Sequence, residues 1–369
     1  MVSYSQTAQM PNRRIIMIRV GIIGVGNISH KHIRELLEIK DCKITAICDI
    51  RDEALEHVAK WVGIDSDHCF KDYRDLVDCP DVDAVEICTP NYLHVPMAEY
   101  AVQQGKPVNV EKPLALKAED TENLEKMIAE RNHPNMMCFS YRFMPGVRYA
   151  KHIIDRGLIG KIISINVEYL KSTGLQEGRR LEWRFVKKYA GTGVLGDLGV
   201  HLIDMMRLLI GDVKSVSAMA GIVVKKRQML DSDEYGDVET DDYCNFIAEV
   251  EDRASGEGIP ATFSITRCAI GHANTIKFDI FATNGTISFD LNNPQILKVC
   301  IGEIDKNGNG LHTVNVPDKF KINQEQMFVD MVNGKDCELL PTVEDGIECQ
   351  KILDALLESS ETGKRITLK

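Results

Sequence analysis

Apolar and polar residues follow one pattern over residues 18–143 and a different one from residue 144 onward. Continuous apolar runs, which are typical of strands buried on both faces, occur at 18–24, 43–49, 84–90, 107–113 and 135–143. Between them, apolar residues recur at helical spacing and predict helices at 30–39, 52–61, 96–106 and 117–131. Strands and helices that alternate in this way predict a doubly wound parallel sheet.

From residue 144 the rhythm changes to long alternating strands with fewer helices. Helices are predicted at 146–156 and 197–210, and another begins at a Thr342 cap. Strands are predicted at 161–172, 213–226, 241–251, 259–270, 274–283 and 285–290. This pattern predicts an α+β domain with a large open, mostly antiparallel sheet. We therefore expect three regions, a polar tail at 1–17, the parallel-sheet domain at 18–143 and the second domain at 144–369.

A glycine turn directly follows the first predicted strand, in "GIIGVGNIS". Gly24 permits a tight turn, and Gly26 lets the backbone approach a pyrophosphate that the helix N-terminus attracts. Asn27 and Ile28 complete the turn, and Ser29 stands where a third glycine is common. Glycine pairs also occur in ordinary turns, so the strand before and the helix after decide the interpretation. The segment predicts a dinucleotide site.

Asp49 ends the second predicted strand, where an acid is expected to hydrogen-bond a ribose 2′-hydroxyl. Its carboxylate would repel a 2′-phosphate, which favours NAD over NADP. Arg51 complicates the choice because its guanidinium could pair with that phosphate, so NADP stays open.

Polar residues also gather at the ends of the later strands, where ligands bind in doubly wound sheets. They are Thr89, Pro90, Asn91 and His94 after one strand, Glu111 and Lys112 after the next, and Tyr141 and Arg142 after the last. We expect cofactor contacts from this edge. A surface loop histidine is the alternative for His94. Lys112 emerges from a buried strand toward the expected nicotinamide, which disfavours a merely solvated lysine.

The segment "GTGVLGDLGVHLIDMMRLLIG" places Asp197, His201 and Asp204 at helical spacing, on one face if the helix is continuous. Its glycines leave the helix start open to close approach by a ligand. One alternative is an N-cap at Asp197 beside a core-edge histidine. A metal site is disfavoured because ligand-rich motifs such as HExxH are absent from the sequence, and no metal is predicted.

Composition excludes several other classes of protein. The chain has 369 residues, 44% of them hydrophobic, and a formal charge of -11 without a basic block. These values disfavour nucleic acid and anionic membranes as partners, and no apolar run is long enough to span a membrane. The 11 scattered cysteines fit free thiols, and no apolar signal core is present, so we expect a cytoplasmic protein.

Four motifs in this order, "GIIGVGNIS", "CTPNYLH", "EKPLAL" and "GTGVLGDLGVHLID", resemble the Gfo/Idh/MocA oxidoreductases. The resemblance covers nearly the whole chain from residue 18. It implies an N-terminal Rossmann domain that binds NAD(P) and a C-terminal domain for substrate and oligomerisation. It further implies that Lys112 is the catalytic lysine, and that Asp197 and His201 are the catalytic acid and histidine. Ser29 and Thr192 depart from the common pattern, but both are small.

The expected reaction is oxidation of a secondary hydroxyl of a sugar, polyol or glycoside, with hydride transfer to the cofactor. A histidine with a pKa of about 6.5 suits a general base, so His201 is assigned that role. Asp197 would orient His201, and Lys112 would stabilise the alkoxide; the roles of Lys112 and His201 could be exchanged. Weaker candidates for substrate contacts are Tyr169, Trp183 and Arg184.

Two alternative functions remain on the same fold, an NAD-dependent glycoside hydrolase that returns the hydride and a non-catalytic sensor. The long strands of the second domain are expected to expose a wide apolar sheet face. Because such a face is normally covered, we expect a homo-oligomer.

Overall fold

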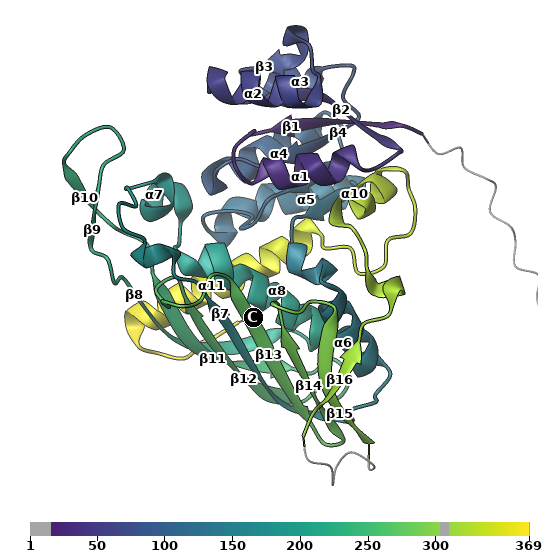
Figure 1. Ribbon diagram of the computed structural model, residues 1–369, viewed down its shortest axis with the longest axis vertical. Coiled ribbons are helices and arrows are strands. Elements are labelled where there is room, and N and C mark those ends of the chain that lie inside the picture. The colour runs from purple at the N-terminus through teal and green to yellow at the C-terminus, as the bar shows by residue number, and fades with distance from the viewer. Residues whose placement is uncertain (1–15, 303–309, 369) are drawn as a thin grey trace, which may run out of the picture.

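The computed structural model describes residues 16–302 and 310–368, and its elements form two domains, one above the other in Figure 1. The tail expected at 1–17 falls almost entirely outside these residues. The upper domain contains six parallel strands in the order β3-β2-β1-β4-β5-β6. This order is that of a dinucleotide-binding Rossmann sheet and confirms the predicted parallel sheet.

The strands of this sheet are β1 (Ile18–Ile23), β2 (Cys42–Cys48), β3 (Cys69–Phe70), β4 (Ala84–Ile87), β5 (Val108–Val110) and β6 (Asn135–Met137). The helices between them are α1 (Ser29–Leu37), α2 (Asp52–Val62), α3 (Tyr73–Asp78), α4 (His94–Gln103) and α5 (Glu122–Arg131). Strands β1, β4 and β5 are buried along almost their whole length, as their continuous apolar runs predict.

The lower domain contains a sheet of nine strands in the order β16-β15-β14-β13-β7-β12-β11-β8-β17. They are β7 (Ile162–Leu170), β8 (Val213–Gly221), β11 (Tyr243–Glu251), β12 (Gly258–Thr266), β13 (Thr275–Ala282), β14 (Gly285–Asp290), β15 (Ile296–Ile301), β16 (His312–Asn315) and β17 (Ile366–Thr367). Strands β7 and β12 pair in parallel and the other neighbours pair antiparallel. A separate hairpin joins β9 (Lys226–Gln228) to β10 (Tyr235–Asp237). The predicted open, mostly antiparallel sheet is confirmed.

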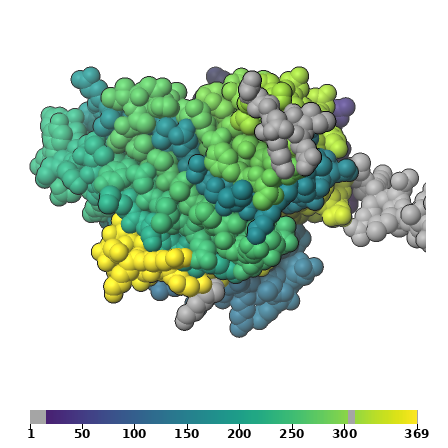
Figure 2. Space-filling view, turned by 90° about the horizontal axis from the view of Figure 1, so that it is seen from below, coloured from purple at the N-terminus to yellow at the C-terminus, as the bar shows by residue number. Residues whose placement is uncertain are grey.

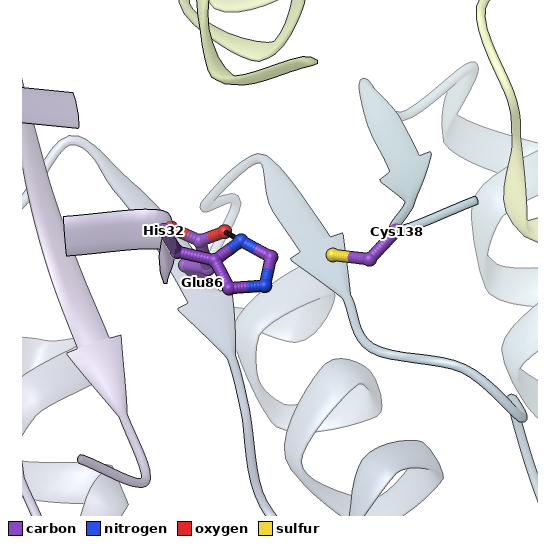
Figure 3. Close-up of side chains that lie close together, drawn as sticks. All are labelled: His32, Glu86 and Cys138. Carbon is purple, nitrogen blue, oxygen red and sulfur yellow. Dashed lines mark ion pairs between the residues drawn. The ribbon is translucent and has the colours of Figure 1, made fainter. Parts of the chain in front are cut away.

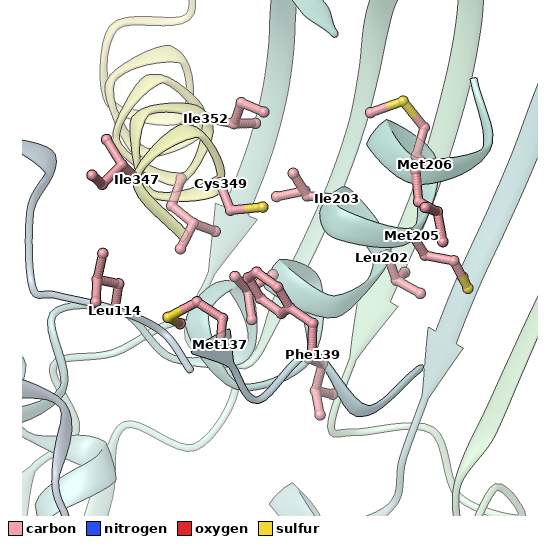
Figure 4. Close-up of a cluster of buried hydrophobic side chains, with 14 of the residues drawn as sticks. Leu114, Met137, Phe139, Leu202, Ile203, Met205, Met206, Ile347, Cys349 and Ile352 are labelled. Atoms are coloured by element: carbon pink, nitrogen blue, oxygen red, sulfur yellow. The ribbon is translucent and has the colours of Figure 1, made fainter. Parts of the chain in front are cut away.

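Helices cover one face of this sheet and connect it to the domain above. They are α6 (Pro145–Asp155), the short α7 (Lys187–Ala190), α8 (Val200–Leu209) and α11 (Val343–Thr362). Figure 4 shows apolar side chains of α8 and α11 meeting Leu114, Met137 and Phe139 from the ends of the parallel sheet. One continuous core therefore passes from one domain to the other.

Two predicted strands are shorter than their apolar patterns suggest. The run at 135–143 forms a strand only to Met137, because residues 140–143 turn into a 3₁₀-helix in which the N–H of Arg142 donates to the carbonyl of Phe139. The strand predicted at 213–226 ends at Gly221. There the Asp242 carboxylate accepts the N–H groups of Val223 and Val224 and draws the chain away from the sheet.

Helix α10 (Gln324–Val332) returns from the second half of the sequence to the first domain (Figure 1). Its Met327, Phe328 and Val329 are buried in the same cluster as Ile33 and Leu36 of α1. A boundary at 143/144 therefore leaves out a helix that completes the core of the parallel-sheet domain.

The outer face of the nine-stranded sheet is less apolar than expected. Ile247 lies between Ser217 and Thr262 on the neighbouring strands, and Thr262 is paired in turn with Asn166. Seen from below in Figure 2, residues of the C-terminal half make up most of the visible surface. Among the described residues, no helix has the length and apolar character needed to cross a membrane.

Candidate active site

A cleft lies at the carboxyl edge of the parallel sheet, where the two domains meet. Its lining combines residues from the ends of β4 and β5 with residues of the second domain. They are Ile28, Thr89, Asn91, Glu111, Lys112, Pro113, Trp183, Arg184, Ala190, Thr192, Gly193, Asp197 and Arg267. Five residues predicted from the strand ends and the glycine-rich segment line this one cleft, namely Thr89, Asn91, Glu111, Lys112 and Asp197.

Lys112 and Asp197 form the contact between the two domains at this cleft. The Lys112 Nζ donates to the Asp197 carbonyl at 2.8 Å and lies 3.2 Å from the Asp197 Oδ1. Burial alone would raise the pKa of Asp197, but the positive charges of Lys112 and Lys171, with those of Arg267 and Arg184, hold it well below its usual range. Asp197 is therefore ionised and keeps the ammonium group of Lys112 in place.

His201 lies in the first turn of α8, buried against the ring of Tyr141 at a centroid distance of 4.6 Å. Burial, and then the positive charge of Lys112, lower its pKa well below the ordinary value. Within the described part of the chain, its buried Nδ1 has no hydrogen-bond partner. The imidazole is therefore neutral at neutral pH, in the form that accepts a proton.

Thr89, His94 and Glu111 support the backbone around Lys112. The two ring nitrogens of buried His94 lie 2.8 Å from the carbonyl oxygens of Pro113 and Thr89. The Glu111 Oε2 accepts the N–H of Lys112 at 3.0 Å. His94 is thus not a surface loop histidine, and it ties two strand ends together.

The glycine-rich segment takes its shape from Asp241, which sequence reasoning missed. Its carboxylate accepts the N–H of Gly193 at 2.6 Å and of Leu195 at 2.9 Å, and a side chain on Gly193 would collide with the Asp241 backbone. Thr192 caps the same segment by accepting the N–H of Gly196. Residues 195–199 form a π-helical turn that leads into α8.

The glycine turn after β1 fits a dinucleotide. Gly24 has φ +86°, and a Cβ there would collide with the Cys88 carbonyl, whereas a Cβ on Gly26 would meet only the Arg51 guanidinium. Ser29 fills the third glycine position by donating its hydroxyl to the Gly26 carbonyl. Asn27 lines the hollow in front of this turn together with Val25, Gly26, His30, Arg51, Asp52, Glu53, Ala54 and His57. The open backbone at Gly26 leaves space for a pyrophosphate.

Asp49 and Arg51 meet at the edge of this hollow. The Asp49 carboxylate accepts the Val25 N–H at 3.0 Å and two side-chain bonds of 3.1 Å from Arg51. Burial raises the pKa of Asp49, but the hydrogen bonds from Arg51 and Val25 outweigh burial and lower it. The acid is therefore ionised where a ribose hydroxyl is expected, and it partly neutralises Arg51.

Other predicted residues lie outside the lining of this cleft. Arg142 is buried in ion pairs with Asp204 at 2.6 Å and Asp345 at 2.9 Å, so it is not the cofactor contact in the cleft that the sequence predicted. Asp204 is paired with Arg142, whereas Asp197 is paired with Lys112. Tyr169 is buried, with its hydroxyl 2.7 Å from that of Tyr141. Pro90 precedes a short 3₁₀-helix that carries Asn91.

Arg267 and Lys171 also belong to this region but were not predicted. Arg267 follows β12, donates to the Asp241 carbonyl at 2.9 Å and lines the cleft. Lys171 follows β7, and its ammonium lies 5.3 Å from the centre of the Tyr169 ring. Their only sequence signal is a cation directly after an alternating strand, which is common on protein surfaces.

The fold and this cleft define a two-domain oxidoreductase that uses a dinucleotide. Residues 18–139 match the oxidoreductase family with an NAD-binding Rossmann fold, and residues 147–288 match the GFO/IDH/MocA C-terminal domain. The chain belongs to the Gfo/Idh/MocA family, and its N-terminal domain is an NAD-binding Rossmann domain.

Similar proteins include levoglucosan dehydrogenase of Pseudarthrobacter phenanthrenivorans, 32% identical over 73% of this chain and 70% of the relative. Another is scyllo-inositol 2-dehydrogenase (NAD(+)) of Bacillus subtilis, 29% identical over 73% of each chain. A solved levoglucosan dehydrogenase in complex with NADH and levoglucosan superposes with a TM-score of 0.85 at 28% identity, covering 95% of this chain and 99% of that one.

Proposed function

We propose that the protein oxidises a secondary hydroxyl of a sugar, polyol or glycoside to a ketone, with NAD as the hydride acceptor. The observation that carries the proposal is the contact of Lys112 with Asp197 beside a neutral, buried His201. The lysine ammonium lines the cleft, and the uncharged imidazole is buried close enough to feel its charge. Together they provide the charge and the proton acceptor that alcohol oxidation requires.

The residues around the glycine turn are suited to hold the cofactor. Gly24 and Gly26 would admit the pyrophosphate, and the ionised Asp49 would accept a ribose hydroxyl. Glu111 and Asn91 line the cleft into which the rest of the dinucleotide would extend. Bound NAD supplies the hydride acceptor. The carboxylate of Asp49, already paired with Arg51, supports NAD rather than NADP.

His201 is assigned the role of accepting the hydroxyl proton, and Lys112 that of stabilising the negative charge on the substrate oxygen. A neutral imidazole accepts the hydroxyl proton, and the ammonium stabilises the negative charge that develops on the substrate oxygen. Asp197 orients Lys112, since the contacts of its carboxylate and carbonyl are made with that ammonium. This arrangement differs from the expected pairing of Asp197 with His201 and favours Lys112 as the electrostatic group.

The substrate class is supported by the names of the relatives, which act on levoglucosan and on scyllo-inositol. Trp183 and Arg184 line the cleft, with the Arg184 guanidinium 4.5 Å from the centre of the Trp183 ring. An aromatic face beside hydrogen-bond donors suits a sugar ring with its hydroxyl groups.

The test is incubation with NAD or NADP and a panel of levoglucosan, L-sorbose, inositols, glucose 6-phosphate and glycosides. We expect one or more to give a lasting rise in the absorbance of reduced cofactor, which the Lys112→Met variant does not give. An aglycone released without that rise would indicate a hydrolase that returns the hydride. Cofactor binding without turnover across the panel would indicate a sensor.

The protein is further proposed to act in the cytoplasm as a homo-oligomer. All 11 cysteines are free, which fits a reducing compartment. A second copy of the chain would cover the outer face of the nine-stranded sheet, where Met219 and Ile247 are exposed.

A further inference from the structure

His32 is a buried histidine in contact with three acids, one of which, Glu111, lines the cleft. Figure 3 shows it beside Glu86 and Cys138. His32 of α1 is 1% exposed and Glu86 of β4 is fully buried, as is Glu325 of α10. Sequence reasoning assigned none of them a role. Charged groups are almost never this deeply buried unless they are paired, so their arrangement requires an explanation.

Each ring nitrogen of His32 lies at hydrogen-bond distance from a carboxylate. The Nε2 is 3.0 Å from the Glu111 Oε1, whereas the Nδ1 is 2.7 Å from the Glu86 Oε1 and 2.9 Å from the Glu325 Oε1. Carboxylates on both sides of the ring are each given a donor when the imidazole carries a proton on both nitrogens. Burial alone would lower the pKa of His32, but the charges of Glu86 and Glu325 raise it well above the ordinary value. The geometry is therefore that of an imidazolium bridging three acids.

Neighbouring side chains complete this cluster from further elements. The Asn109 amide donates to the Glu86 Oε1 at 3.0 Å, and Gln324 donates to the Glu325 Oε1 at 2.8 Å. The thiol of Cys138 donates to the side-chain amide oxygen of Asn109 at 3.2 Å. The charges facing His32 are thus Glu86, Glu111 and Glu325, with the thiols of Cys88 and Cys138 nearby.

The cluster reaches the active site through Glu111. One oxygen of its carboxylate binds His32, and the other accepts the N–H of Lys112 at 3.0 Å. Although burial alone would raise the pKa of Glu111, the bond from His32 and the charge of Lys112 lower it to about 2. A change at His32 therefore acts on the backbone that carries the amine of the proposed site.

We propose that His32 is a positioning residue whose imidazolium anchors Glu111 to the buried acids Glu86 and Glu325 and so fixes the 111–113 segment at the cleft. This inference deepens the proposed function and rests on it for its catalytic consequence. Glu325 gives α10 a functional reason to return to the first domain, because it places the third acid on His32.

A bound metal is the competing reading, since His32, Glu86 and Cys138 offer ligand atoms close to one another. The contacts favour hydrogen bonds, because Nδ1 already faces two carboxylates and the thiol already has a partner in Asn109. Metal analysis of the purified protein separates the two. One equivalent of a transition metal that leaves with chelator would overturn the proposal.

The protonation state is tested without any substrate, by NMR of protein carrying ¹⁵N-labelled histidine. We expect one histidine with both ring nitrogens protonated at pH 8, and this signal is absent from His32→Gln and retained in His133→Gln. His133 is the matched control because it is also buried in the first domain but binds the Lys106 carbonyl instead. A neutral His32 ring at pH 8 would overturn the proposal.

Positioning is tested by hydrogen exchange of the Lys112 amide, the donor to Glu111. We expect faster exchange across 108–114 in His32→Gln and in the milder Glu325→Gln, with His133→Gln like the wild type. Unchanged exchange at this segment in a folded His32→Gln protein would contradict the role. A uniform rise over the whole domain would show only lost stability and would equally contradict it.

With a substrate from the panel, His32→Gln should lower kcat by about 10-fold or more while KM for NAD changes less, because the catalytic segment is displaced. Loss of the cation leaves Glu111 uncompensated near His201, whose other charged neighbours are Lys112, Asp197 and Lys171. The acid limb of kcat/KM should therefore move to higher pH. If His32→Gln has the kcat of the wild type and the acid limb of its kcat/KM profile does not move, the catalytic consequence is refuted. If no compound is oxidised, the proposed function fails, and the NMR and exchange results still decide the role of His32.

Discussion

Lys112 combines two polar contacts with a largely buried side chain. Its N–H is bound by Glu111, its ammonium by Asp197, and its side chain is largely buried. Replacement by methionine keeps the length and removes the charge. We expect Lys112→Met to lower kcat by about 100-fold or more while NADH binding persists. Lys117→Met, at an exposed lysine paired with Glu119, is the control, and turnover of Lys112→Met near that of the control would remove the mechanism.

The lowered pKa of His201 determines how the activity should depend on pH. A base whose pKa lies below the ordinary histidine value of about 6.5 stays unprotonated further into acid. We expect the acid limb of kcat/KM to fall below about pH 6.5. Linkage gives the same sign for folding, because the unfolded chain takes up this proton more readily and stability is lost as pH falls below the unfolded pKa. A limb above pH 7 would assign the proton to another group.

Asp49 is expected to decide the preference of the protein for NAD over NADP. Its ionised carboxylate accepts hydrogen bonds from the Val25 N–H and the Arg51 guanidinium at the place expected for the ribose. In Asp49→Ala, NAD loses an acceptor for its 2′-hydroxyl, while Arg51 is released to bind a 2′-phosphate. We expect KM for NAD to rise by about 10-fold and KM for NADP to rise less or to fall. Equal losses for both, measured on the same protein, would contradict the assignment.

At the scale of elements, local patterns predicted those segments whose burial is visible in their own apolar and polar residues. Strands β1, β4 and β5 have continuous apolar runs, and β11 and β12 alternate along their length. The Glu-Lys-Pro segment and the glycine-rich segment could be located from their own residues. Their mutual contact could not be derived from spacing, because the Lys112–Asp197 bond spans 85 positions.

The missed elements depend on distant partners. The end of β6 at Met137 follows from turns that Phe139 and Arg142 make, and Arg142 is drawn inward by Asp204 and Asp345. The sequence predicts only that His32 lies in the helix at 30–39, because its acids Glu86, Glu111 and Glu325 lie 54, 79 and 293 residues away. Buried charge clusters carry no local periodicity.

The buried ion pairs of Arg142 are expected to contribute to the stability of the fold. They join the 3₁₀-helix at 140–143 to α8 through Asp204 and to α11 through Asp345. Removing one partner leaves a buried guanidinium only partly compensated. We expect Asp204→Asn to lower the free energy of unfolding by about 3 kcal/mol, measured by urea denaturation. Asp212→Asn, whose partner Arg207 binds it at the surface, should change stability by less than about 1 kcal/mol.

At the scale of the whole molecule, the nine-stranded sheet has one face that helices cover and one face that is open. Helices α6, α8 and α11 bury the inner face, and the outer face carries small polar side chains with scattered apolar ones. Small side chains such as Thr262 and Asn166 leave the sheet surface flat, which suits close approach by another sheet. The open face is therefore the surface on which a second copy would dock.

Ile247 lies at the middle of β11 on that face, with 59% of its surface exposed. If two copies pack there, a lysine at this position buries a charge at the interface and the assembly separates. We expect light scattering to give a multiple of the 41.4 kDa chain mass for the wild type and a smaller mass for Ile247→Lys. Ile270→Lys changes an even more exposed isoleucine in the turn after β12 and should keep the wild-type mass. A monomeric wild type, or an Ile247→Lys variant of unchanged mass, would show that this face is not the contact between copies.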